Sequence, residues 1–503
     1  MSKAFRRAMA LIGPASAGPL AVTQGLALGG DGRIAIEPGS GRNGYGCVAS
    51  PDPDLVRFGS STASTIGKTG YRAATMLCER IGLCTDGAVQ LNEAAMAAAR
   101  IRQDLIDLCG IRHRGGVQAI LAASGTDAHL IFAQLVLHLP GPGWLAIMPD
   151  ASETGSGVPM AIAGRHFAGK SALGATTTKG AALSDRTPAA ILHYAVRNPD
   201  GSARSLSAID DEIDAAIFRA TAAGQRVLLV AVDGSKTGIV APSPARVVGW
   251  KSALGDMIEI LVDACQFRLP TARLEYYLAG GCTVAVTGSK FMGGPIFSGA
   301  LLVPGSVAAR LRGVAPSAAL ADYTARHDWP AQWSAVEKLD TPVNVGLLLR
   351  WQAALAEMQR FRAVPEKAVQ AIVADFRTRF TAMMQRCATI APIRDDLPDL
   401  APGSAATIFP FHLMIGDGGT PRRANPDESR HAYRQMREPD IRPTIPRLRF
   451  ELGQPVALGR NDAVLRLSLS APLIADAHHR GPDHLTNLAA SALARLADLT
   501  SAG

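Results

Sequence analysis

The stretch "VAVTGSKFMGGPIFSGALLV" (Val284–Val303) joins two apolar runs through a short segment that contains one lysine and paired glycines. The first run has the character of a buried strand, and Lys290 stands just beyond its end. A lysine at this position is either a solvated turn residue or an amine held in a cleft. The remainder of the chain distinguishes between these two interpretations.

Short apolar runs alternate with helical patterns through the middle of the chain. Strands that alternate with helices form a mostly parallel sheet covered by helices. The predicted fold class is therefore α/β, with a large domain over 61–320. The runs expected to be strands are 117–123, 144–149, 189–196, 226–232, 258–264, 282–288 and 296–303.

The chain outside this domain divides into two parts. Residues 1–60 are rich in Gly and Pro, which predicts an extended arm packed on the body of the protein or on a partner subunit. Residues 321–503 are expected to form a linking loop, a long helix and a small α+β C-terminal domain. The segments behind this expectation are a helix at about 343–362 continued at 366–387, strands at 406–415 and 463–471, a final helix near 482–499, and a polar mobile loop at 416–447.

The composition argues against nucleic acids and membranes as binding partners. The formal net charge of +8 would suit a nucleic acid or a membrane surface, but the basic residues are scattered and aromatic residues make up only 5%. No run reaches the roughly 20 apolar residues of a membrane span. Neither partner is expected, whereas the modest basic excess suits small anionic substrates.

The seven cysteines show no disulfide or metal-binding pattern. Their number is odd, and no pair has the spacing of a metal site. We therefore expect free thiols, no metal and a cytoplasmic location. The first residues are basic and then apolar, as in a signal peptide, but Gly13, Pro14, Gly18 and Pro19 interrupt the apolar run and argue against secretion.

Ligands of parallel α/β sheets bind at the carboxyl ends of the strands, so the residues that follow each strand are examined first. The segment "ASGTDAH" follows the 117–123 run and places Ser124, Gly125 and Thr126 at the start of a helix. Free N–H groups at such a start favour an anion. An ordinary N-cap explains the same residues equally well.

Two charged residues end neighbouring strands of the expected sheet. Asp263 emerges directly from the apolar run "IEILV", where a carboxylate must be paired. Lys290 follows at the end of the next strand, and a desolvated amine in a cleft can attack an aldehyde. The convergence of amine, carboxylate and anion site favours the cleft interpretation, with a loop-bracing role as the alternative for Asp263.

The segments "SGT", "VDACQ", "TGSK" and "GGPIFSG", in this order, resemble the pyridoxal-phosphate (PLP) enzymes of fold type I. The resemblance is greatest to their class V aminotransferase and cysteine desulfurase branch, and it extends over about 60–350. It implies PLP as cofactor, a fold type I architecture and a homodimer with its site between subunits and domains.

The resemblance also implies roles for individual residues. Lys290 corresponds to the lysine that forms the Schiff base with the cofactor, and Asp263 to the partner of its pyridinium nitrogen. The phosphate would be held by Ser124, Gly125 and Thr126, joined by Thr287 or Ser289.

Four further residues match cofactor contacts of this branch. Ser235, in "DGSKTGIVAP", and Gln266 resemble residues that hydrogen-bond the phenolic oxygen of the ring. Ser298 and Gly299 match the loop that reaches the phosphate of the neighbouring subunit.

Three residues match the substrate side. Arg466, in "LRLSLS", corresponds to an arginine that grips the substrate α-carboxylate as a bidentate pair, with a surface or inter-strand arginine as the alternative. Arg57 and Asn344 match regions that line the substrate in relatives, although a structural role is favoured for each.

The chain departs from the branch in two places. Where relatives place a ring-stacking histidine or aromatic, this sequence has Glu153 and Thr154, with His166 further on, so the stacking residue is unassigned. Residues 305–345 contain no cysteine, which argues against a persulfide-forming desulfurase. The same loop carries His327, Asp328 and Trp329, which are candidates for substrate contact.

The leading interpretation is an aminotransferase that acts on an amino acid and uses a keto-acid co-substrate. A lyase that eliminates at Cβ, or that cleaves a C–S or Cα–Cβ bond, is the alternative, because the same lysine and cofactor serve both. A catalytically inactive PLP-fold binding protein is less favoured, since Lys290 and Asp263 are both present.

Overall fold

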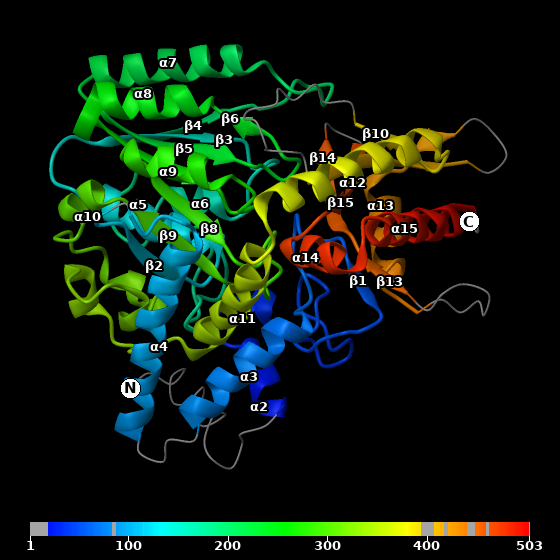
Figure 1. Ribbon diagram of the computed structural model, residues 1–503. Helices are drawn as coiled ribbons and strands as arrows, with labels where there is room; N and C mark the ends of the chain where they lie inside the picture. Colours follow the sequence, from blue (N-terminus) through cyan, green and yellow to red (C-terminus); the bar gives the residue numbers. More distant parts are fainter. Residues whose placement is uncertain are drawn as a thin grey trace.

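The computed structural model describes residues 19–82, 87–113, 115–393, 407–416, 421–439, 448–458 and 462–501. Figure 1 shows a large part built around one sheet and, beside it, a smaller part built from C-terminal elements. This arrangement confirms the predicted α/β fold with a smaller C-terminal α+β region. The domain boundaries at 60 and 320 remain predictions, and the first 18 residues of the expected arm lie outside the described residues.

The large sheet contains every strand predicted from the apolar runs. Its order is β2-β9-β8-β7-β5-β3-β4, and all neighbours are parallel except β9, which is antiparallel to both β2 and β8. The carboxyl ends of β2, β7 and β8 therefore meet at one edge. The strands are β2 (Gln118–Ala122), β3 (Trp144–Pro149), β4 (Ala190–Tyr194), β5 (Arg226–Asp233), β7 (Ile258–Asp263), β8 (Thr283–Thr287) and β9 (Gly299–Val303), with the short β6 (Val240–Ala241) paired to β5.

Successive residues of these strands face two separate hydrophobic cores, as the period of two requires. In β5, for example, Leu229 belongs to one core and Leu228 to the other. The core that contains Leu229 also takes residues from α7 (Leu206–Ala222), α8 (Pro244–Leu254) and α9 (Thr271–Ala279). The opposite core takes residues from α5 (Gly125–Leu137), α6 (Val158–Ile162) and α10 (Gly305–Leu311).

A long buried helix, α11 (Val345–Arg362), lies among the N-terminal helices α2 (Pro19–Leu26), α3 (Lys68–Gly82) and α4 (Gly87–Leu108) (Figure 1). Neighbours surround α11, which explains why apolar residues occupy most of its circumference. The next helix, α12 (Glu366–Arg386), leads into the smaller part. Short 3₁₀ helices are η2 (Gly32–Ile34), η3 (Gly255–Met257), η4 (Ala318–Asp322), η5 (Arg326–Asp328) and η6 (Ser334–Lys338).

The smaller part contains an antiparallel sheet in the order β10-β11-β15-β14. A separate parallel pair, β1 (Leu55–Arg57) with β13 (Arg449–Glu451), joins a segment before the large sheet to the C-terminal region. The remaining elements are β10 (Ile390–Pro392), β11 (Ile408–Ile415), β12 (Arg422–Arg423), β14 (Gly453–Leu458), β15 (Asp462–Ser468), α14 (Ala471–Arg480) and α15 (Asp483–Ser501).

The prediction of a loop over 416–447 is wrong in its centre, where α13 (Pro426–Gln435) forms. Asn425 and Glu428 make a capping box at its start, which satisfies free N–H groups there. Its polar composition concealed a short apolar stripe that includes Ala432 and Tyr433, both buried. Residues 417–420 and 440–447 of the predicted loop lie outside the described residues.

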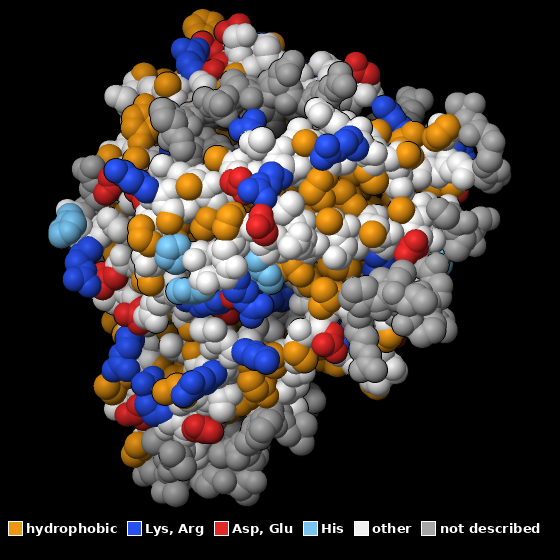
Figure 2. Space-filling view, turned by 45° about the vertical axis from the view of Figure 1, so that its right-hand side comes forward, with side chains coloured by type: hydrophobic (Ala, Val, Ile, Leu, Met, Phe, Trp, Pro, Cys, Tyr) orange, Lys and Arg blue, Asp and Glu red, His pale blue; other side chains and the backbone are white. Residues whose placement is uncertain are grey.

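Two further observations concern the surface and the helices. In the face drawn in Figure 2, basic side chains are interspersed with acidic and apolar ones over the coloured residues. Within the described ranges, no helix combines the length and the apolarity needed to cross a membrane.

Candidate functional site

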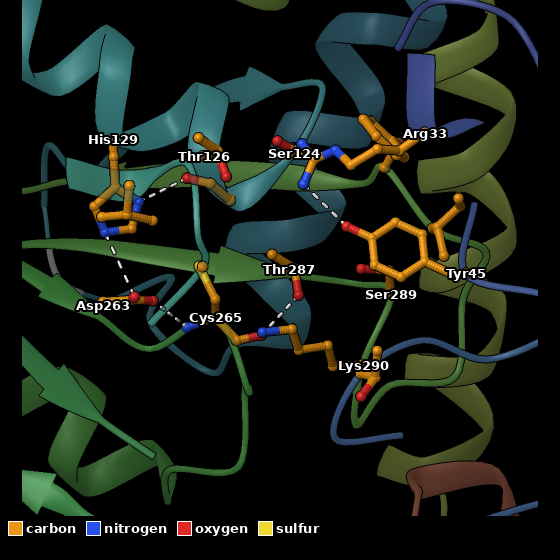
Figure 3. A pocket seen from close by; sticks show the side chains of 16 residues that line it. Arg33, Tyr45, Ser124, Thr126, His129, Asp263, Cys265, Thr287, Ser289 and Lys290 are labelled. Carbon is orange, nitrogen blue, oxygen red and sulfur yellow. Dashed lines mark hydrogen bonds and ion pairs between the residues drawn. The ribbon is translucent and has the colours of Figure 1, made fainter. Parts of the chain in front are cut away.

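A cavity of about 110 Å³ opens at the edge where β2, β7 and β8 end. On this measure one water molecule needs roughly 10–15 Å³, so the cavity has room for a small organic ligand. The sequence-predicted residues that line it are Ser124, Gly125, Thr126, Asp263, Thr287, Ser289 and Lys290 (Figure 3).

The start of α5 forms one wall of the cavity. Ser124 is its N-cap in extended conformation, and its hydroxyl accepts a hydrogen bond from the Asp127 N–H at 3.2 Å. A Cβ at position 125 would lie 2.7 Å from the Cys265 Sγ, so the close approach of α5 to β7 requires glycine there. The structure thus places an N-cap and the free N–H groups of a helix start in the same wall.

Asp263, at the end of β7, is buried at the opposite end of the cavity. Its Oδ1 accepts a hydrogen bond from the Cys265 N–H at 3.1 Å, and its Oδ2 lies 3.5 Å from the Nε2 of His129. Burial acts to raise the pKa of Asp263, but His129, Lys290 and the hydrogen bond outweigh it and hold the pKa below the ordinary value. Asp263 is therefore an ionised acceptor in an enclosed site.

His129 is a cavity residue that the sequence analysis missed. It lies on α5 one turn after Gly125, and its Nδ1 is 2.7 Å from the Gly125 carbonyl oxygen. Among the described residues its buried Nε2 has no hydrogen-bond partner, although it faces Asp263. The signal was available, because residues four apart share a helix face and His129 is four residues beyond Gly125.

Lys290 follows β8 in a turn packed tightly against α11. Figure 3 shows its side chain extending across the cavity toward Cys265 and Asp263. A Cβ on Gly288 or Gly294 would lie 2.5 or 2.6 Å from the Cβ of Ala354 on α11. Gly288 and Gly294 allow the turn to pack closely against α11. This packing fixes the position of Lys290.

The predicted contacts to the phenolic oxygen and to the neighbouring subunit do not line this cavity. Ser235 is buried and donates its hydroxyl to Glu153 Oε2 at 2.7 Å, and Gln266 donates its side-chain amide to the Ser61 carbonyl at 2.9 Å. The Ser298 hydroxyl donates to the Pro295 carbonyl at 3.2 Å. Gly299 starts β9 so close to β2 that a Cβ would lie 2.5 Å from the Ser124 carbonyl oxygen.

The predicted substrate residues also contact protein groups. Arg466 donates to the Lys236 carbonyl at 2.9 Å and to the Thr62 hydroxyl at 2.8 Å, and Thr62 itself lines the cavity. Burial lowers the pKa of Arg466 to about 10. Arg57 donates to the Thr65 carbonyl, and Asn344 caps α11 and donates to the Gly29 carbonyl.

Glu153 anchors a buried network instead of facing the cavity. It accepts hydrogen bonds from Ser235, from the Thr237 hydroxyl at 2.8 Å and from Arg197 Nε at 2.7 Å. Burial acts to raise the pKa of Glu153, but Arg197 and these hydroxyls outweigh it and lower the pKa.

The other residues noted as candidates for stacking or substrate contact lie outside the cavity lining. Thr154 is buried, and His166 Nδ1 lies 2.7 Å from the Tyr323 hydroxyl. Asp328 accepts a hydrogen bond from the Ala325 N–H, Trp329 donates to the Thr324 hydroxyl, and the His327 carbonyl accepts from Arg102.

The cavity is also lined by two residues of the N-terminal arm, a segment to which the sequence analysis assigned no chemistry. Arg33 and Tyr45 both line it, and Arg33 Nη1 donates to the Tyr45 hydroxyl at 3.0 Å (Figure 3).

His129, Asp263 and Cys265 are buried with potential metal-ligand atoms within 4.8 Å of one another. Burial, followed by the charge of Asp263, holds the pKa of the Cys265 thiol well above its ordinary value. A metal ion would therefore have to displace a firmly held proton. The absence of a metal stays a prediction.

No protein-family model and no curated protein matches this sequence. Solved structures match over most of the chain. A C-DES mutant with glycine covalently linked to the PLP cofactor is 14% identical, with a TM-score of 0.54 over 89% of this chain and 100% of that chain. The cystine C-S lyase C-DES with its product cysteine persulfide is 15% identical, with a TM-score of 0.51 over 87% and 97%.

A third similar structure is TDC of Oryza sativa with PLP and tryptamine. It is 12% identical, with a TM-score of 0.50 over 89% of this chain and 84% of that chain. At these identities the likeness is one of fold, and it agrees with the fold type I architecture expected from the sequence.

Proposed function

We propose that this protein is a PLP-dependent enzyme that acts on an amino acid and holds its cofactor through Lys290. The observation that carries the proposal is the placement of Lys290 in one cavity between a helix start suited to an anion and the ionised Asp263. PLP carries its phosphate arm and its aldehyde on neighbouring ring carbons, with the ring nitrogen opposite the aldehyde, and the cavity offers an anion site, an amine and a carboxylate for these three groups.

Three features of the cavity fit this cofactor. The buried Nε2 of His129 lies 3.5 Å from Asp263 Oδ2, where it can stabilise the ionised carboxylate that would face the ring nitrogen. Gly125, without a side chain, lets the start of α5 approach Cys265 closely. Thr287 and Ser289 place hydroxyl groups on the wall near Lys290.

When bound, PLP supplies an electron-withdrawing ring that stabilises negative charge at the substrate Cα. Asp263 would hold a proton on the ring nitrogen, and His129 would keep that carboxylate oriented and ionised. The start of α5, with Ser124 and Thr126, would bind the phosphate. The Nζ of Lys290, once released by the substrate amine, would take the proton from Cα.

An aminotransferase with a keto-acid co-substrate remains our leading proposal for the reaction. A lyase is the alternative, and the likeness in fold to a cystine C-S lyase is compatible with it. We also propose a cytoplasmic homodimer, with amino-acid substrates, on the strength of the sequence resemblance.

The cofactor test uses two nearby lysines as a matched pair. Purified protein is incubated with PLP, reduced with borohydride and digested, and the labelled peptide is identified by mass spectrometry. Wild type and Lys236→Ala should show a visible absorbance band and carry the label on Lys290, whereas Lys290→Ala should carry none. Lys236 is a demanding control, because burial and then Arg466 lower its pKa to about 8. A colourless wild type, or a label that survives in Lys290→Ala, would refute the proposal.

The reaction test offers a panel of amino acids to the PLP-loaded enzyme, with and without a keto acid. Conversion of the cofactor to pyridoxamine phosphate would support transamination. Sustained product release without any keto acid would establish the lyase alternative in its place.

A further inference from the structure

The N-terminal arm enters the cavity and is fixed there by its own chain. Arg350 on α11 is fully buried and donates hydrogen bonds to the carbonyls of Leu26 and Gly29, at 3.1 and 2.8 Å. Asn344 at the start of α11 donates to Gly29 as well, at 3.1 Å. The segment that follows residue 29 is therefore anchored beside the cavity before it reaches Arg33.

Arg33 is held in a defined orientation. Its Nε and Nη2 donate to the two carboxylate oxygens of Asp31, with distances of 2.6 to 3.0 Å, and Asp31 is buried. Arg33 retains 37% of its side-chain accessibility, and the cavity is the space that it faces. One N–H on Nη1 and one on Nη2 remain available, since a guanidinium has five donors and three of them are used here.

Tyr45 adds a second donor to the same wall. Its hydroxyl accepts a hydrogen bond from Arg33 Nη1 at 3.0 Å, which leaves the hydroxyl hydrogen free to donate to a ligand. Its backbone is fixed by Arg437, which donates to the Tyr45 carbonyl at 2.7 Å. Burial is the main cause that raises the pKa of Tyr45, so the hydroxyl keeps its proton.

Phe297, a residue in a strained backbone conformation, packs against Arg33 in the cavity wall. Phe297 lines the cavity with φ at 68°, a left-handed conformation that is an outlier for an aromatic residue. The Arg33 guanidinium carbon lies 5.3 Å from the Phe297 ring, and Arg350 Nε donates to the Phe297 carbonyl at 2.7 Å. Arg350 therefore fixes both the arm and Phe297, on which the Arg33 guanidinium packs.

The two ends of the cavity carry different groups, namely Arg33 with its partner Asp31 at one end and Asp263 with His129 at the other. Figure 3 shows Arg33 beside Ser124 at the start of α5, with Asp263 and His129 at the other end. Donors from Arg33, Tyr45 and the helix start converge at the first end. A ligand that fits both ends carries an anion at the α5 end and a proton donor at the Asp263 end.

We propose that Arg33 and Tyr45 form an arm-borne clamp that binds the phosphate of PLP in cis, together with the start of α5. This rests on the proposed function, because it takes PLP as the ligand. The clamp adds an arginine and a phenol to the phosphate site from a segment that precedes the large sheet. It makes the N-terminal arm a cofactor-binding element of this protein.

The test compares Tyr45→Phe with Tyr276→Phe, which makes the same chemical change at an exposed tyrosine on α9. Dissociation constants are measured for PLP and for pyridoxal, which lacks the phosphate, by absorbance titration of the full chain. Loss of one hydrogen bond to a charged group should weaken PLP binding by about tenfold or more in Tyr45→Phe. Pyridoxal binding should be unchanged in that variant, and Tyr276→Phe should match wild type for both ligands.

The arginine is tested with Asp31→Asn/Arg33→Gln, because the double change avoids leaving a buried carboxylate unpaired. It should show the same selective loss of PLP affinity. Equal weakening of PLP and pyridoxal would overturn the proposal, since it would place the clamp on the ring. Unchanged PLP affinity with weaker amino-acid binding would also overturn it, because the anion would then be the substrate carboxylate.

A third measurement separates this proposal from the proposed function. Inorganic phosphate is added to the cofactor-free full chain, and the thermal midpoint is followed. If wild type fails to bind PLP but is stabilised by phosphate, and Tyr45→Phe is stabilised less, the clamp stands as an anion site while the proposed function fails. If phosphate affects wild type and Tyr45→Phe equally, the clamp is refuted.

Discussion

Gly288 gives the sharpest test of how Lys290 is positioned. A Cβ at this position would lie 2.5 Å from the Cβ of Ala354, and 3.2 Å from both Ser298 Oγ and Trp351 Cζ3. Carbon atoms prefer separations of about 3.5–4.0 Å, so the turn or α11 would have to move by about 1 Å. Overpacking of this kind costs roughly 1–3 kcal/mol, and we expect Gly288→Ala to lower the free energy of unfolding by that amount.

The partner substitution identifies the contact that is responsible. Ala354→Gly alone should cost about 1 kcal/mol as a glycine within a helix. Ala354→Gly removes the Cβ with which the Cβ introduced by Gly288→Ala would clash. The unfolding free energy of the double variant should therefore exceed the sum expected from the two single variants by about 1 kcal/mol or more. Gly249→Ala on α8 is the control, since a Cβ there meets nothing within 4 Å.

Urea unfolding followed by circular dichroism measures these free energies. Gly249→Ala should be neutral or stabilising, by up to about 1 kcal/mol. If Gly288→Ala costs no more than Gly249→Ala, or if Ala354→Gly gives no rescue, then the turn does not rest on α11 as described.

Two further predictions concern residues beside the cavity, Asp127 on α5 and Arg350 on α11. Burial raises the pKa of Asp127 to about 7, so the folded chain keeps a proton that the unfolded chain releases, and the stability this provides is lost as the pH rises through about 7. In urea unfolding between pH 5 and pH 8, wild type should therefore lose roughly 3 kcal/mol more of its unfolding free energy than Asp127→Asn. Parallel pH profiles for the two proteins would contradict this prediction. Arg350→Met removes the hydrogen bonds to the carbonyls of Leu26, Gly29 and Phe297. Amide hydrogen exchange in the arm should therefore accelerate at least about tenfold, while the amides of β5 stay protected. Unchanged exchange in the arm would contradict the anchoring role of Arg350.

The sheet and part of the cavity were predictable because they leave strong local signals. Apolar runs that end at polar or small residues predicted the strands of the large sheet, except for the short β6. Asp263 and Lys290 were conspicuous because each is a charge at the end of a buried strand, where desolvation makes an unpaired charge costly. The start of α5 was recognisable from Ser124 and Gly125 at the end of an apolar run.

The remaining cavity residues depend on contacts that no local pattern expresses. Arg33 and Tyr45 lie in a Gly/Pro-rich segment without periodicity, and carbonyl contacts to a helix more than three hundred residues later bring them to the cavity. The resemblance assigned Ser235 by position, but a hydroxyl bonds the nearest strong acceptor, and here Glu153 supplies it. Which acceptor a hydroxyl bonds depends on the groups that the tertiary structure brings near it, and a local sequence pattern does not show this.

The pairing of β1 with β13 and the hold of Arg350 on the arm have a consequence for synthesis of the chain. During translation the arm emerges hundreds of residues before the helix that fixes it and the strand that pairs with β1. Domains generally fold from the N-terminus as they are made, but here the arm must wait undocked until those later partners are synthesised. A ribosome-bound chain that ends before α11 would therefore carry Lys290 and Asp263 without the wall that contains Arg33.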